Sequence, residues 1–207
     1  MTNNKKTSKE IQAERRVSIA PLFFTVLMGI AYDRMIEVAS KSFSSGGLTL
    51  DNILLVSTFL LISMRFFIGN QLYLISEGFN NLSSLAWIYD FLIITLESIC
   101  IVFLGSLSSV DVNQNTSLGF VQFMLILYVV DVFWLLSLVF LRKLFRRQLN
   151  SIPLSWFVLN LFLFILIIIL NYLINDLYST VGLAWLVVLN LIGFILDVVI
   201  IDYSDLL

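Results

Sequence analysis

The segment Leu60–Leu74, LLISMRFFIGNQLYL, decides the class of this protein. It is apolar along most of its length and yet carries an arginine, Arg65, near its middle. The apolar run around it, residues 52–75, exceeds the roughly 18 residues that a helix needs to cross a bilayer. In a chain of 207 residues that is 59% hydrophobic and 13% charged, such a run indicates a membrane-spanning helix.

Five other runs of comparable length share this composition. Together with the first, the predicted spans are residues 18–39, 52–75, 86–105, 118–141, 152–174 and 181–201. The links between them are too short to hold a soluble domain, and strand-like alternation is absent. We therefore expect an all-α, polytopic integral membrane protein. A bundle of six transmembrane helices would occupy residues 18–207, preceded by a polar arm at residues 1–17.

Basic residues are unevenly distributed along the chain. Five of them precede the first span, and the link after the fourth span contains Arg142, Lys143, Arg146 and Arg147. With six spans, both groups fall on the same side of the membrane, and the positive-inside rule makes that side cytoplasmic. We predict a multi-pass protein of the cell membrane with both termini in the cytoplasm.

Charged residues inside the predicted spans are the main functional clue. An arginine at the bilayer centre costs about 2.5–3.5 kcal/mol on insertion scales, so Arg65 needs an acidic partner. We expect it to pair with Glu97 or Asp131, which lie at similar depth. The predicted intramembrane charge network consists of Arg65, Glu97, Asp131, Asp90 and Asp197. A second predicted cluster, in the outer half of the first span, consists of Asp33, Arg34 and Glu37.

Acidic residues outnumber basic residues within the spans. A buried carboxyl group without a cation must be protonated, or must face water or a bound cation. This surplus favours a pathway for cations or protons. The alternative is that these side chains only form hydrogen bonds between helices.

The sequence contains few of the residues and motifs that are typical of catalytic or metal-binding sites. The chain has no histidine and one cysteine, so we expect no metal site and no cofactor. The segment Gly193–Asp197, GFILD, lacks the second glycine beside the aspartate that membrane aspartyl proteases show, and we expect no enzymatic activity. Phosphate-binding glycine loops and nucleic-acid motifs are also missing.

Three interpretations of function remain, of which the third, an intramembrane enzyme, has the least support in the sequence. The first is a small cation or proton channel, or a transporter, that forms a homo-oligomer in the lipid bilayer. The second is a membrane anchor or effector subunit, for example of a bacterial stress or defence system. Such a subunit would bind a cytoplasmic protein through residues 1–17 or the basic loop Leu141–Asn150.

Overall fold

The computed structural model describes residues 8–45, 49–75, 83–108, 114–144, 151–174 and 177–204. Within these ranges it contains helices and no strand. The helices are α1 (Ser8–Ser45), α2 (Leu50–Ile75), α4 (Ser84–Leu107), α5 (Gln114–Leu144), α6 (Ser151–Ile174) and α7 (Thr180–Ser204). Six long apolar helices confirm the predicted all-helical class, and each has the length and composition to cross a membrane.

A serine or threonine directly precedes three of the helices and caps them. The side chains of Thr49, Ser83 and Ser179 precede α2, α4 and α7, and each accepts a hydrogen bond from the backbone amide three residues later. A hydroxyl in this position satisfies one of the amides that have no partner inside the helix. These caps fix where the apolar helices start.

The first helix is longer than its apolar segment. It contains 38 residues, whereas the apolar part runs over Ile19–Ser44. Residues 8–17 of the predicted arm continue α1 without a break, and residues 1–7 lie outside the described ranges. Pro21 therefore lies inside α1. Its carbonyl accepts hydrogen bonds from Thr25 and from Gln71 of α2.

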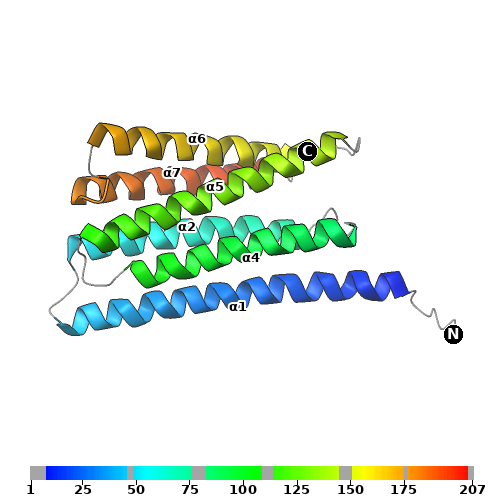
Figure 1. The fold of residues 1–207 in the computed structure, drawn as a ribbon, viewed down its shortest axis with the longest axis horizontal. Helices are drawn as coiled ribbons and strands as arrows, with labels where there is room; N and C mark the ends of the chain where they lie inside the picture. The colour runs from blue at the N-terminus through cyan, green and yellow to red at the C-terminus, as the bar shows by residue number, and fades with distance from the viewer. Residues whose placement is uncertain are drawn as a thin grey trace.

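Five helices form a closed ring and the sixth lies outside it. Around the ring, α2 packs against α7, α7 against α6, α6 against α5, α5 against α4, and α4 against α2. The first helix packs against α4 and α2 on the outer side of the ring. Figure 1 shows α1 along one edge of the bundle and α6 along the opposite edge. Side chains of α2, α5, α6 and α7 can therefore meet in the interior.

The two ends of the bundle differ in sequence. At one end of the bundle, α1, α4 and α6 begin and α2, α5 and α7 terminate (Figure 1). We call this the basic end, because the basic sequence clusters lie at the start of α1 and at the end of α5. The interior of the half toward the other end is mainly apolar and also buries small polar side chains, including those of Asn52, Thr58, Ser108 and Ser117. Its fully buried side chains include a set that we call the hydrophobic layer: Leu55, Phe59, Ile101, Leu104, Phe120, Met124, Leu183 and Leu186.

Candidate functional site

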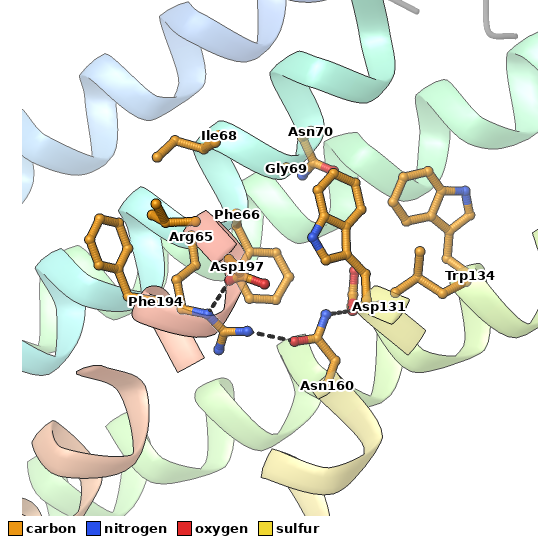
Figure 2. Close-up of a pocket in the computed structure, with 13 residues that line it drawn as sticks. Arg65, Phe66, Ile68, Gly69, Asn70, Asp131, Trp134, Asn160, Phe194 and Asp197 are labelled. Carbon is orange, nitrogen blue, oxygen red and sulfur yellow. Dashed lines mark hydrogen bonds and ion pairs between the residues drawn. The ribbon is translucent and has the colours of Figure 1, made fainter. Parts of the chain in front are cut away.

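Arg65 projects from α2 into the interior of the ring, and its side chain is only 3% exposed. Its Nε atom donates to Oδ2 of Asp197 on α7 at 2.6 Å, which is also an ion pair. Its NH1 atom donates to the hydroxyl of Tyr128 on α5 at 2.7 Å, and NH2 donates to Oδ1 of Asn160 on α6 at 2.8 Å. The three nitrogens of one guanidinium thus bind three different helices. Figure 2 shows the bonds to Asp197 and Asn160.

The direct acidic partner differs from the one expected. We predicted Glu97 or Asp131, but the ion pair is with Asp197. The reason is the helix arrangement, because α2 lies directly against α7 in the ring. Asp131 is reached indirectly: Asn160 accepts from Arg65 and donates through Nδ2 to Oδ2 of Asp131 at 2.6 Å (Figure 2).

Tyr128 extends the network on the other side of the arginine. Its hydroxyl accepts from Arg65 and donates to Oδ1 of Asn190 at 2.8 Å, and the tyrosine is fully buried. Our sequence analysis did not identify Tyr128 as a site residue. The available signal was its position three residues before Asp131, which places both side chains on one face of α5.

Gly193 makes the space that the guanidinium occupies. A Cβ atom at this position would lie 2.8 Å from Cζ and NH1 of Arg65 and 2.8 Å from Cδ1 of Leu163. Contacts this short do not occur between ordinary side chains, so any other residue would displace the arginine or Leu163. The glycine of α7 is therefore part of the site.

A small cavity lies beside the network. It is lined by Arg65, Asn70, Asp131, Asn160 and Asp197, together with apolar side chains that include two tryptophans (Figure 2). All of its lining residues lie in the half of their helices nearer the basic end. The volume open to the centres of water molecules is about 40 Å³. A cavity needs roughly 10–15 Å³ on this measure to hold a water molecule, so the space suits a few waters at most.

Glu97 is separate from the arginine network. It lies on α4, is fully buried, and accepts from Nδ2 of Asn70 at 2.9 Å through Oε2. Its other oxygen, Oε1, is buried and has no hydrogen-bond partner. Asn70 also lines the cavity, so this single amide links Glu97 to the polar interior.

Asp90 has its own set of donors. Tyr73 of α2 donates to Oδ2, and the indole Nε1 of Trp134 on α5 donates to Oδ1 at 2.9 Å. The two aromatic rings meet edge to face with their centroids 4.9 Å apart. This buried carboxyl group joins α2, α4 and α5 near the basic end.

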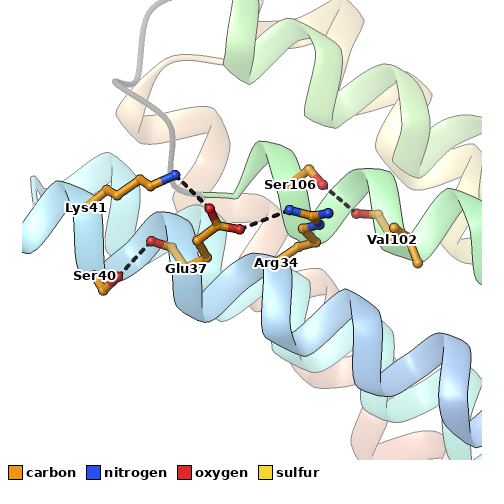
Figure 3. A network of polar contacts seen from close by, with 6 residues as sticks. All are labelled: Arg34, Glu37, Ser40, Lys41, Val102 and Ser106. Carbon is orange, nitrogen blue, oxygen red and sulfur yellow. Dashed lines mark hydrogen bonds and ion pairs between the residues drawn. The ribbon is translucent and has the colours of Figure 1, made fainter.

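The second predicted cluster is an exposed ladder on α1. Glu37 accepts from Arg34 at 3.0 Å and from Lys41 at 2.7 Å, and all three side chains are largely exposed (Figure 3). Asp33 is exposed on the same helix and takes no part in these two ion pairs. Exposed pairs at spacings of three and four contribute only a few tenths of a kcal/mol. The ladder therefore belongs to the surface of α1.

Most of the basic loop, Leu141–Asn150, lies outside the residues that the structure describes. Arg142 and Lys143 belong to α5, but their side chains are not described, and Arg146 and Arg147 fall in the undescribed residues 145–150. In the part of the chain that the structure describes, no group of three or more His, Cys, Asp or Glu residues is arranged to hold a metal ion.

Comparison with protein-family models, with curated proteins and with solved structures gave no match for this chain. Inference about its function therefore depends on the geometry described above.

Proposed function

We propose that this chain is a multi-pass membrane protein that conducts protons as a channel. The observation that carries the proposal is the chain of buried groups Asp197, Arg65, Asn160 and Asp131 beside a cavity of water size. Carboxyl groups next to internal water are the usual components of intramembrane proton relays. A space this small favours a proton over a hydrated metal cation or an organic substrate.

Electrostatic balance supports the same proposal. Arg65 is the one buried basic side chain among the described residues, and Asp197 already neutralises it. Asp131 accepts a hydrogen bond from the amide of Asn160 and lines the cavity. A buried carboxyl group that faces internal water can take up a proton from that water and release it again.

We further propose that the basic end faces the cytoplasm of the cell, following the distribution of Lys and Arg. Protons would then enter the cavity from the cytoplasmic side, since its lining residues lie toward the basic end. The proposal assigns no catalytic reaction. The homo-oligomer expected from the sequence stays a prediction, which crosslinking in native membranes would test.

Proton flux into liposomes tests the proposal. The purified protein is reconstituted with a pH-sensitive dye inside, and a potassium gradient with valinomycin drives protons across the membrane. We expect the internal pH reported by the dye to change faster than in empty liposomes. Asp131→Asn should reduce the rate of this change to that of empty liposomes. Asp33→Asn is the matched control, because Asp33 is exposed on α1 outside the network. Absence of flux in the wild type, or full flux in Asp131→Asn, would overturn the proposal.

A second candidate function is an anchor or effector subunit with a cytoplasmic partner. It is favoured by the start of α1, which begins at Ser8 although its apolar segment begins at Ile19. This extension and the end of α5 place basic sequence at one end of the bundle. Deletion of residues 1–17 and charge reversal at Arg146 and Arg147 would remove a copurifying partner under this interpretation. Proton flux would remain unchanged in both variants if the first proposal holds alone.

A further inference from the structure

Glu97 differs from every other buried acid in its surroundings. Asp197 has a guanidinium, Asp131 has an amide and the cavity, and Asp90 has two aromatic donors. Glu97 is completely buried, has one amide donor, and leaves Oε1 with no partner. A polar atom left unpaired in the interior is costly, and a charged one more so.

Its position along the bundle is equally distinctive. Glu97 is close to the middle of α4, and Ile101 and Leu104 follow it one and two turns later toward the end opposite the basic end. Both belong to the hydrophobic layer. Among the buried side chains that the structure describes, no acidic or basic group lies beyond Glu97 in that direction. Glu97 is therefore the last fully buried acidic residue between the cavity and the hydrophobic layer.

A polar contact joins Glu97 to the cavity. Asn70 lines the cavity and donates to Oε2 of Glu97. The titratable groups that act on Glu97 are Asp131, on the neighbouring α5, and Cys100, one turn along α4. No basic side chain among the described residues forms an ion pair with Glu97, from α1, α2 or α5, which pack against α4.

We propose that Glu97 is an exchangeable proton-binding site at the closed end of a path that enters from the basic end. In the resting state the carboxyl group is neutral, with the proton on Oε1 and Oε2 accepting from Asn70. When the proton leaves, the O–H bond on Oε1 breaks and the proton passes to a water molecule that enters from the cavity beside Asn70, which leaves a carboxylate held by the Asn70 amide. This inference rests on the proposed function and names the residue at which the inward path ends.

Infrared spectroscopy of the protein in lipid bilayers tests the inference without any measurement of flux. A protonated carboxyl group gives a C=O band at higher wavenumber than a carboxylate, and the band moves when D₂O replaces H₂O. We expect the wild-type protein to show such a band at neutral pH. The band should be absent in Glu97→Gln, a variant whose side-chain oxygen can still accept the hydrogen bond from Asn70. An unchanged carboxyl region in Glu97→Gln would overturn the inference.

Two further measurements complete the test. Carboxyl ¹³C labelling of all glutamates should shift the same band in the wild-type protein, which gives an answer even if Glu97→Gln does not fold. Asn70→Leu should slow exchange of the band with D₂O, whereas Asn171→Leu, at an exposed position on α6, should leave the rate unchanged. Equal exchange rates in both variants would contradict the path through Asn70. Flux with no Glu97 band would refute this inference alone, and a Glu97 band with no flux would refute the proposed function alone.

Discussion

The Nε atom of Arg65 lies 2.6 Å from Oδ2 of Asp197, although the two residues are 132 positions apart in the chain. This ion pair ties the second span to the last one, its neighbour in the ring. It also leaves Asp131 and Glu97 with no ion-pair partner among the described residues.

Removing one member of this pair should destabilise the protein strongly. Asp197→Asn leaves a buried guanidinium without its counter-charge, and we expect a loss of about 3 kcal/mol in the free energy of unfolding. Arg65→Met in the same chain should recover most of that loss, because the unpaired charge is gone. Unfolding by SDS in mixed micelles measures the two single variants, Asp197→Asn and Arg65→Met, and the double variant. If the double variant loses the sum of the two single losses, the residues are not coupled.

Prediction from the sequence succeeded where hydrophobicity alone decides the structure. Each of the six apolar runs forms one helix, because an unbroken run longer than the bilayer core leaves few alternatives for the backbone. The length of α1 was underestimated, since residues 8–17 are polar and carry no apolar signal, yet they continue the helix.

The pairing of charged residues could not be predicted in the same way. Arg65, Glu97 and Asp131 were placed by depth, which a linear count along each span provides. Which helices are neighbours depends on packing between spans, and the sequence contains no direct signal that α2 lies against α7. The need for an acidic partner was therefore predictable, whereas its identity, Asp197, was not.

The glycine opposite Arg65 offers a second test of the site. Gly193→Ala introduces a Cβ atom 2.8 Å from Cζ of Arg65, so the guanidinium must move away from its three partners. We expect a loss of about 1–3 kcal/mol in the free energy of unfolding, as for other overpacked interiors. Gly29→Ala on α1 is the control, because nothing lies within 4 Å of its added atom. This control should be neutral or slightly stabilising, since alanine favours a helix by roughly 1 kcal/mol over glycine.

Loss of the tyrosine hydroxyl should weaken the network on its other side. Tyr128→Phe leaves NH1 of Arg65 and Oδ1 of Asn190 without the oxygen that joins them. The expected loss is about 1–3 kcal/mol, the usual cost of unsatisfied buried polar groups. Tyr172→Phe, at a residue that is 81% exposed, should have no measurable effect in the same unfolding assay. Equal stability of the two variants would mean that water replaces the hydroxyl.

The contact between α1 and α4 depends on one glycine and is separate from the ring. A Cβ atom on Gly105 would lie 2.4 Å from the backbone oxygen of Ala31, and a backbone atom cannot rotate out of the way. Gly105→Ala should therefore push α1 away from α4. Spin labels at two exposed positions, Ile36 on α1 and Phe103 on α4, would report this as a longer or broader distance distribution.

The matched control for this variant is Gly119→Ala on α5, whose added atom would lie at an ordinary 3.6 Å from a side-chain carbon of Leu107. The distance distribution should then match that of the parent protein. Because α1 packs outside the ring, the Arg65–Asp197 ion pair should survive in Gly105→Ala, and the destabilisation by Asp197→Asn should be the same in that background. A smaller effect of Asp197→Asn in that background would show that α1 helps to hold the ring closed.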